Sequence, residues 1–249
     1  MKVSVTHNGK LFEADLNLGI DLSIPVSTES KLNAYHAHPV KMEPFQMGDW
    51  IGEVAQGASV NYRNIAFNPH GNGTHTECLG HISSEIHSVN QHFKQFHCVA
   101  QLISIEPVTI QNRDLVIKAG QLPVLDGTDA VIIRTLPNTE AKRNLNYSGS
   151  NPPYFDVEAI KKLVEYGCKH LILDVPSVDR EEDGGKLLGH KAFWNYPEAP
   201  RMDCTITELA FIPASVVDGL YLLNLQVAPF ENDAAPSRPL LFPLKANRI

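Results

Sequence analysis

The chain has 249 residues, of which 43% are hydrophobic and 20% are charged, and its formal net charge is −7. This size and apolar content suffice for a full core, and we expect one α/β domain over residues 1–249. The net negative charge excludes a basic field that would attract nucleic acid or an anionic membrane, and no apolar run reaches membrane-spanning length.

The apolar runs predict a fold rich in strands. Asn8-Gly9 accepts the positive φ angles of a tight turn and lies between two short apolar segments, so we expect a β-hairpin near the N-terminus. Further runs rich in Val, Ile and Leu predict strands at residues 20–23, 99–105, 130–134, 171–174 and 220–227.

One helix is clearly marked. Asp156 is a good N-cap, the apolar residues after it recur at helical spacing, and Gly167 can end the helix in the left-handed conformation. The helix joins the predicted strands at 130–134 and 171–174, and such a crossover implies that part of the sheet is parallel. Together with the other strands, this predicts a mixed sheet.

Two segments rich in Pro and Asn, residues 144–153 and 180–200, are expected as long loops that either bind a ligand or form surface insertions. Residues 33–50 and 181–201 are expected to form a pocket. Trp50, Phe193 and Trp194 could stack there on an aromatic substrate, although core packing or loop anchoring is the use we expect of each.

The cysteines and the N-terminus indicate the compartment. Cys78, Cys98, Cys168 and Cys204 form neither a CxxC pair nor a dense disulfide pattern, which predicts reduced thiols. The first residues alternate apolar with polar side chains and lack the continuous apolar segment of a signal peptide. We therefore expect a soluble, cytoplasmic protein.

Histidines are concentrated in one segment. Six of the eleven lie between positions 70 and 97: His70, His75, His81, His87, His92 and His97. His75 and Glu77 are two residues apart, so on an extended backbone both side chains can meet one ion. Imidazole with carboxylate is a ligand set suited to Zn²⁺, Mn²⁺ or Fe²⁺. Residues 70–81 therefore predict the core of a divalent-metal hydrolase site.

Two ligands are too few for a stable site, so others must come from distant segments. His190 follows the turn at residues 176–179, and Glu208 lies in an apolar context where an unpaired carboxylate would be costly. A buried salt bridge or an N-cap is the alternative for Glu208. The remaining histidines are interpreted as structural, and Asp174 and Asp179 as turn or loop braces.

Other catalytic schemes have weaker support. Cys78 adjoins Glu77, whose negative charge disfavours a thiolate. The chain contains no Gly-x-Ser-x-Gly elbow, no phosphate loop and no dinucleotide fingerprint.

The segment Gly71-Asn-Gly-Thr-His75-Thr-Glu77-Cys-Leu-Gly-His81 resembles the His-x-Gly-Thr-His-x-Asp-x-Pro-x-His motif of the metal-dependent cyclase family, which includes bacterial kynurenine formamidase. Three further segments resemble the family in the same order along the chain: Ile20-Asp-Leu-Ser23, Ile133-Arg-Thr135 and Leu173-Asp-Val-Pro-Ser-Val-Asp179.

The resemblance implies a swivelling β/β/α fold, usually a homodimer, that holds Zn²⁺ or Mn²⁺. It implies that His75, Glu77, His190 and Glu208 are metal ligands and that His81 is the catalytic histidine. The implied reaction is hydrolysis of an amide, such as N-formylkynurenine to kynurenine and formate in tryptophan catabolism. A metal that activates water and an imidazole that shuttles a proton agree with that chemistry.

Three departures from the motif bear on this expectation. Gly71 stands where the family has its first histidine ligand, Glu77 replaces Asp, and Cys78-Leu-Gly80 replaces Ala-Pro-Leu. His70 could substitute as a ligand if the backbone bulges, because an adjacent residue on a regular strand would face the other way. We expect one metal ion rather than two.

The leading hypothesis is thus a metal-dependent hydrolase of an aryl formamide-like amide or a small cyclic substrate. The alternative is a non-catalytic protein that binds a small molecule or a metal on the same fold.

Overall fold

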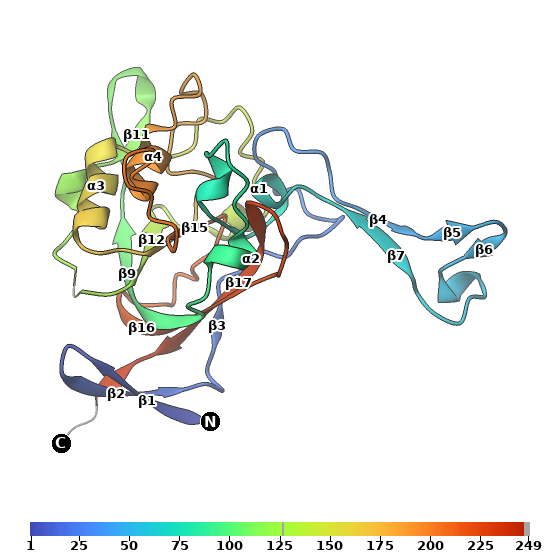
Figure 1. Ribbon diagram of the computed structural model, residues 1–249, viewed down its shortest axis with the longest axis horizontal. Coiled ribbons are helices and arrows are strands. Elements are labelled where there is room, and N and C mark those ends of the chain that lie inside the picture. The colour runs from blue at the N-terminus through green and yellow to red at the C-terminus, as the bar shows by residue number, and fades with distance from the viewer. Residues whose placement is uncertain (126, 247–249) are drawn as a thin grey trace.

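The computed structural model describes residues 1–125 and 127–246, and its centre is a mixed β-sheet (Figure 1). The strands follow the order β16, β9, β12, β14, β15, β8, β17 and β3. β16 also pairs with β17, which closes the first seven of these described strands into a barrel. Their bounds are β3 Ile20–Asp21, β8 His75–Glu77, β9 His97–Ile105, β12 Ala130–Thr135, β14 His170–Leu173, β15 Thr205–Glu208, β16 Gly219–Val227 and β17 Ala234–Pro243.

The strand directions confirm the predicted mixed α/β fold. β9, β12, β14 and β15 are parallel neighbours, and the remaining pairs of the barrel are antiparallel. α3 (Val157–Glu165) connects β12 to β14 as the crossover requires. The carboxylate of Asp156 accepts a hydrogen bond from the amide of Ala159, and Gly167 has a φ of 84°, so both predicted ends of the helix are confirmed.

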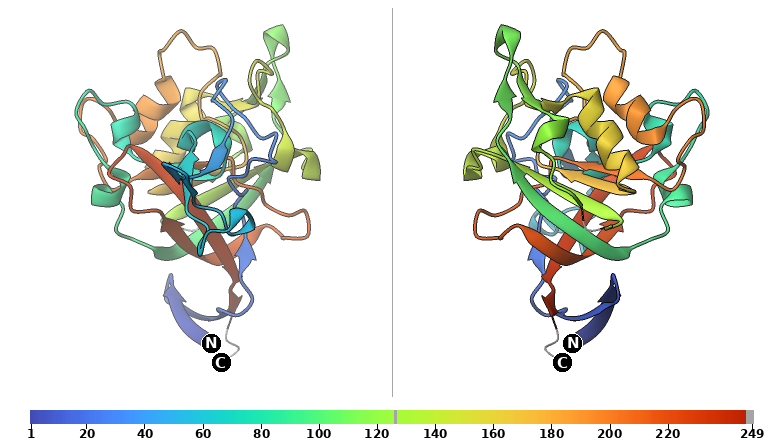
Figure 2. Two further views of the ribbon diagram at one scale, coloured as in Figure 1. Left: turned by 90° about the vertical axis from the view of Figure 1, so that its right-hand side faces the viewer. Right: turned by 90° about the vertical axis from the view of Figure 1, so that its left-hand side faces the viewer.

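The core has two layers because side chains alternate along each strand. On β12, Ile132 packs with the apolar cluster inside the barrel, whereas Val131 and Ile133 pack on the outer face. That outer face is covered by α3 and α4 (Leu188–Trp194), which lie side by side on one flank of the barrel (Figure 2). Burial on both faces explains why β12 is a continuous apolar run.

One sequence prediction needs correction, and one strand has no counterpart in the sequence predictions. Residues 180–200 are not a plain loop, because α4 forms within them. The strand without a prediction is β17, which closes the barrel although prolines at 236, 239 and 243 are untypical of a central strand. Their carbonyls remain available: Pro236 and Pro239 accept hydrogen bonds from the amides of Ala228 and Leu22.

The N-terminal hairpin is confirmed, with Asn8 and Gly9 at positive φ. It comprises β1 (Lys2–His7) and β2 (Lys10–Asp15), and β18 (Lys245–Ala246) pairs with β2 to make a small sheet below the barrel (Figure 2). A further small sheet contains β10 (Val108–Thr109), β11 (Leu115–Ile117) and β13 (Tyr154–Phe155). The short helices α1 (Pro69–Asn72) and α2 (Val89–His92) lie on either side of β8 in sequence.

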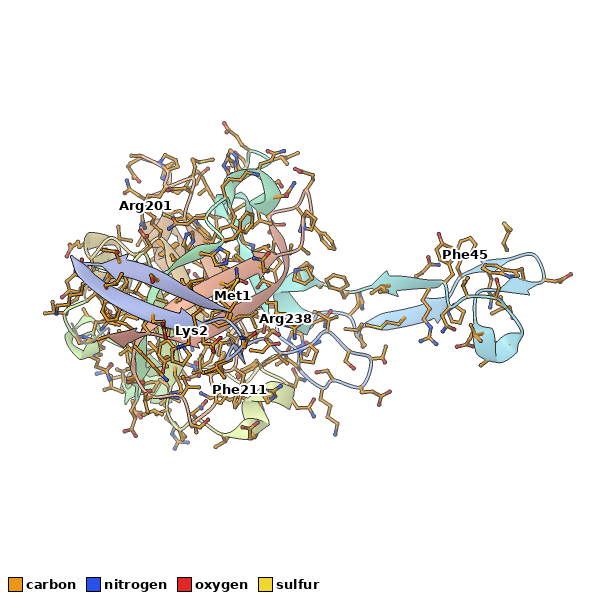
Figure 3. The ribbon with its side chains drawn as sticks, turned by 90° about the horizontal axis from the view of Figure 1, so that it is seen from below. Met1, Lys2, Phe45, Arg201, Phe211 and Arg238 are labelled. Atoms are coloured by element: carbon orange, nitrogen blue, oxygen red, sulfur yellow. The ribbon has the colours of Figure 1, made fainter. Side chains whose placement is uncertain are left out.

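A two-stranded arm extends far from the barrel (Figures 1 and 3). It is built from β4 (Lys41–Pro44) paired with β7 (Arg63–Ala66), and from β5 (Gln46–Met47) paired with β6 (Trp50–Ile51). Phe45, Trp50 and Tyr62 form an aromatic cluster near its tip. Within the described part of the chain, no helix has the length and apolar character needed to cross a membrane.

Candidate metal centre

The register between β8 and β15 brings the first site residues together. His75 lies opposite Glu208 in this antiparallel pair, and the Nε2 of His75 is 3.3 Å from the Oε2 of Glu208. Because side chains alternate, Thr76 and Thr207 project to the other face, where their hydroxyls hydrogen-bond. His75 and Glu77 therefore share the outer face of the barrel with Glu208, and all three are buried.

His190 approaches the same place from α4. Its Nε2 is 3.2 Å from the Oε1 of Glu77, and its Nδ1 donates a hydrogen bond of 2.7 Å to the Oδ2 of Asp179. The carboxylate of Asp179 also accepts the backbone amides of Gly189 and His190 in the first turn of α4. A Cβ on Gly189 would lie 2.8 Å from the Oδ1 of Asp179, so glycine permits this close approach. Asp179 thus holds both the helix and the imidazole.

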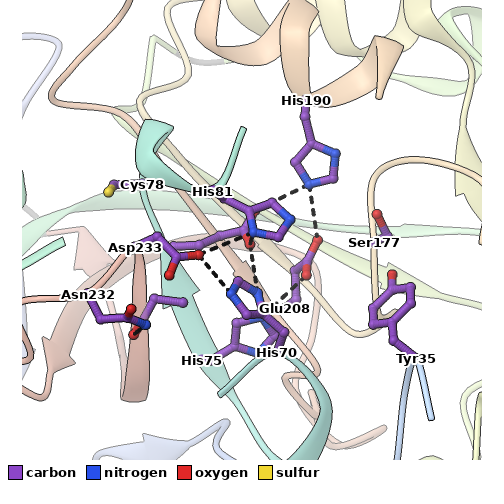
Figure 4. A network of polar contacts seen from close by, with 12 residues as sticks. Tyr35, His70, His75, Cys78, His81, Ser177, His190, Glu208, Asn232 and Asp233 are labelled. Carbon is purple, nitrogen blue, oxygen red and sulfur yellow. Dashed lines mark hydrogen bonds and ion pairs between the residues drawn. The ribbon is translucent and has the colours of Figure 1, made fainter. Parts of the chain in front are cut away.

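His70 and His81 complete the cluster (Figure 4). The Nδ1 of His70 is 3.2 Å from the Oε2 of Glu77, and its Nε2 is 2.9 Å from the Oδ2 of Asp233. The Nδ1 of His81 is 3.3 Å from the same oxygen of Asp233 and 3.7 Å from the Oε2 of Glu77. Every predicted site residue is therefore in one cluster.

The backbone just before β8 is helical. Residues 69–72 form the short helix α1, capped by the side chain of Asn68, which accepts a hydrogen bond from the amide of His70. Because consecutive helical residues do not alternate between two faces, a histidine at position 70 can reach the cluster without a strand bulge. Gly71 instead packs against the segment at Ala34 and Ala37.

The donor set fits a cation, because several buried polar atoms lack a hydrogen bond. These atoms, in the described part of the chain, include the Nε2 of His75, both carboxylate oxygens of Glu77, the Nε2 of His190 and the Oε1 of Glu208. The Nδ1 of His75 lies 3.1 Å from the carbonyl oxygen of Gly73, and because that oxygen can only accept, Nδ1 must carry the proton. The Nε2 of neutral His75 then has a lone pair and no proton, and this lone pair faces the carboxylate of Glu208. Buried polar groups without partners are costly, and a divalent ion would satisfy them.

The electrostatic environment of these side chains favours positive charge at the same place. Burial opposes ionisation of Glu77, yet His81, His190 and His70 hold its pKa well below the usual range. Burial lowers the pKa of His190, but its hydrogen bond to Asp179 and the nearby Glu77 outweigh that effect and raise the pKa to about 10. Burial lowers the pKa of His75 to about 3. Glu208 has a pKa well above its usual range because it is buried and close to Glu77.

A pocket of about 320 Å³ opens onto the cluster. That volume is at the small end of ligand sites and suits a compact molecule. Its wall includes Tyr35, whose hydroxyl donates a hydrogen bond of 3.0 Å to the carbonyl of Pro176. The other lining residues are His70, His81, Ser177, Asp179, Arg180, Glu181, Asp183, Gly185, Leu187, His190 and Glu208.

The structure corrects or refines several predictions about the pocket. Residues 181–187 contribute to its wall, but residues 41–50 belong to the arm. Phe193 and Trp194 are fully buried, which confirms the expected core packing, and Trp50 lies on the arm. None of the three is among the residues that line the pocket. Cys78 is buried and unpaired, and burial raises the pKa of its thiol to about 11, which argues against a thiolate nucleophile.

Two acidic residues of the site escaped sequence reasoning. Asp179 was interpreted as a turn brace, yet it orients His190. Asp233 was not singled out, because nothing in its surroundings, Glu231-Asn-Asp-Ala-Ala, has the spacing of a ligand motif. A signal existed only for Asp179, which lies within the segment that resembles the family.

Comparison with known proteins gives the following matches. The model of the family described as "Putative cyclase" matches residues 20–180. A structure described as a predicted metal-dependent hydrolase from Bacillus stearothermophilus is 17% identical, with a TM-score of 0.60 over 90% of this chain and 97% of that chain. No curated protein matches this chain by sequence.

Two isatin hydrolases also have this fold. Isatin hydrolase A from Labrenzia aggregata, bound to benzyl benzoate, is 17% identical, with a TM-score of 0.64 over 90% of this chain and 93% of that chain. An isatin hydrolase bound to the product analogue thioisatinate is 14% identical, with a TM-score of 0.61 over 92% of this chain and 93% of that chain. These likenesses support the barrel fold described above.

Proposed function

Because the chain belongs to the Putative cyclase family, we propose that it is a metal-dependent hydrolase that cleaves the C–N bond of a small amide, either an aryl formamide or a cyclic amide. Structural neighbours named isatin hydrolase support the cyclic class. Isatin is an aryl amide closed into a ring, so opening it and deformylating an aryl formamide are the same type of reaction. N-formylkynurenine remains one proposed substrate.

The observation that carries this proposal is the cluster of buried nitrogen and oxygen atoms without hydrogen bonds. The residues that would hold one Zn²⁺ or Mn²⁺ ion are His75, Glu77, His190 and Glu208, with His70 as a further candidate. Among the residues that the structure describes, two groups of three side chains have the spacing of a metal site, and both use Glu77. We therefore propose one ion, and a measured content of two per chain would contradict this number.

The chemistry supplied by a bound ion is Lewis acidity, which polarises a carbonyl and acidifies water. The chain provides the rest. His81 lines the pocket and its side chain is 30% exposed, so its imidazole can contact a substrate. We propose that His81 accepts the proton of the attacking water and transfers it to the departing amine nitrogen. Asp233 orients the ring through its Oδ2, which lies 3.3 Å from the Nδ1 of His81.

Metal content of the protein purified without chelator is the first test. We expect about one Zn²⁺ or Mn²⁺ per chain by elemental analysis, and uptake of either ion after removal with EDTA. A chain that holds neither ion and cannot be reloaded would overturn the proposal.

Turnover is the second test, with isatin and N-formylkynurenine as probes. His81→Ala should lower kcat by about 10²- to 10⁴-fold, the usual contribution of a general acid–base, while metal content stays near the wild-type value. His92→Ala is the matched control, because His92 lies on α2 and not among the pocket-lining residues. Unchanged hydrolysis by His81→Ala would refute the role of His81. Bound metal without turnover of any amide, formamide or lactone would favour the non-catalytic binding protein.

We further propose a cytoplasmic homodimer. The arm supports association, because a two-stranded ribbon is marginally stable alone and Met47, Trp50, Tyr62 and Ile65 are exposed on it. Light scattering should give the mass of two chains, and the double variant Trp50→Ser with Tyr62→Ser should shift this mass toward that of one chain. The control is Val217→Ser, at an exposed apolar position outside the arm, which should leave the mass at two chains. A wild-type mass of one chain would contradict the dimer.

Cell fractionation tests the proposed cytoplasmic location.

A further inference from the structure

We propose that Asp233 and His70 form a carboxylate–histidine pair that supplies the imidazole missing at position 71, with His70 as a metal ligand and Asp233 as its positioning residue. The inference rests on the proposed metal centre and extends it to a residue outside the family motif. It gives Asp233, which also contacts His81, a second role that the family motif does not predict.

Position 71 itself cannot provide a ligand in this backbone. A Cβ there would lie 2.4 Å from the Cβ of Ala37 and 2.7 Å from the carbonyl oxygen of Ala34. The amide of Ala34 donates a hydrogen bond to the carbonyl of Gly71, which holds the two segments together. Any side chain at position 71 therefore requires the segment around Ala34 to move, and the imidazole must come from a neighbouring residue.

His70 has the geometry of an oriented ligand. Its Nε2 contacts the Oδ2 of Asp233 at 2.9 Å, which leaves its Nδ1 directed at the Oε2 of Glu77 at 3.2 Å. Histidines that bind metals in proteins characteristically use one ring nitrogen for the metal and the other for a carboxylate or carbonyl. The ring of His70 also lies beside that of His75, with centroids 5.1 Å apart.

The same arrangement occurs on the other side of Glu77. There, the Nδ1 of His190 contacts Asp179 at 2.7 Å and its Nε2 faces the Oε1 of Glu77 at 3.2 Å. Two carboxylate–histidine pairs thus approach the two oxygens of one buried carboxylate. Because His190 already matches a family ligand, its geometry is an internal standard by which His70 can be judged.

Asp233 is held firmly enough to position a ring. Its carbonyl accepts the amide of Cys78, directly after β8, and the carbonyl of the preceding Asn232 accepts the amide of Val89. The side chain of Asn232 donates to the carbonyl of Ala234 at the start of β17. Both flanks of Asp233 are therefore anchored, and its carboxylate lies between His70 and His81 (Figure 4).

The test is metal affinity, measured without any substrate. Zn²⁺ binding by chelator competition and the visible spectrum of the Co²⁺ form are compared for wild type, Asp233→Asn, His70→Ala and the double variant. Asp233→Asn should weaken Zn²⁺ binding about 10- to 100-fold, the usual effect of removing such a partner, and should change the Co²⁺ spectrum. His70→Ala should weaken binding at least as much.

The double variant separates a pair from two independent effects. If Asp233 acts through His70, adding Asp233→Asn to His70→Ala should weaken binding little further. Asp218→Asn is the matched control, because Asp218 pairs with Arg134 and is not among the pocket-lining residues, and it should bind Zn²⁺ like wild type. Melting curves in EDTA establish that each variant folds. Asn is chosen at position 233 because its side chain has nearly the same shape as Asp but no negative charge.

The outcomes are distinguishable. Wild-type Zn²⁺ affinity and an unchanged Co²⁺ spectrum in Asp233→Asn, or full additivity in the double variant, would overturn this inference and leave the proposed function intact. A wild-type chain that binds neither Zn²⁺ nor Co²⁺ would overturn the proposed function, and this inference with it.

Discussion

Replacing Gly71 with alanine should destabilise the protein, because the added methyl group has no space. It would lie 2.4 Å from the Cβ of Ala37 and 2.7 Å from the oxygen of Ala34, where backbone hydrogen bonds resist movement. Overpacking of this kind costs about 1–3 kcal/mol. For a chain of this length, each kcal/mol lowers Tm by about 2–4 °C.

Thermal and urea unfolding in EDTA measure this cost without any contribution from metal binding. Gly120→Ala is the control, because a Cβ at position 120 meets nothing within 4 Å. Gly71→His, which restores the histidine of the family motif, should be at least as destabilising as Gly71→Ala. If Gly71→Ala and Gly120→Ala have the same Tm and the same urea midpoint, the packing argument is wrong. The steric argument that His70 must replace a ligand at position 71 would then fail as well.

Three further predictions concern stability. Zn²⁺ at 100 times its Kd should stabilise the chain by about 2.7 kcal/mol and raise Tm, and the absence of any shift in calorimetry would argue against a specific site. Asp156→Ala should cost about 0.5–2 kcal/mol in urea unfolding because it removes the N-cap bond to Ala159, whereas Asp156→Asn should cost less; equal losses would contradict capping. Burial lowers the pKa of His170 to about 4, so the unfolded chain takes up a proton that the folded chain excludes. Stability should therefore fall as pH drops from about 6.5 toward 4, by up to about 1.4 kcal/mol per pH unit, and His170→Gln should reduce this slope in EDTA; parallel curves would show that His170 does not contribute.

The elements that sequence reasoning located correctly are those with short-range signals. The turn at Asn8-Gly9 and the helix between Asp156 and Gly167 each depend on a few neighbouring residues. The crossover from β12 to β14 follows from that helix, because parallel neighbours need a long connection. Such features are determined locally, and the tertiary structure only places them.

β17 shows where local signals are insufficient. Three prolines argue against a strand within residues 234–243, yet this segment pairs with β16, β8 and β3 and closes the barrel. Proline removes only a donor, and closure depends on which neighbours supply donors to its carbonyls. That information lies in segments distant from β17 in sequence.

At the site, the sequence by itself predicted the chemistry, since His75 and Glu77 are two residues apart and can offer imidazole and carboxylate to one ion. Only the tertiary structure decided how the site is completed. Asp233 is 163 residues from His70 along the chain, and whether their side chains meet depends on the barrel register that places the end of β8 beside the start of β17. Hydrogen bonds over such separations leave no periodic pattern in the sequence, so the second carboxylate–histidine pair emerges only when the barrel closes.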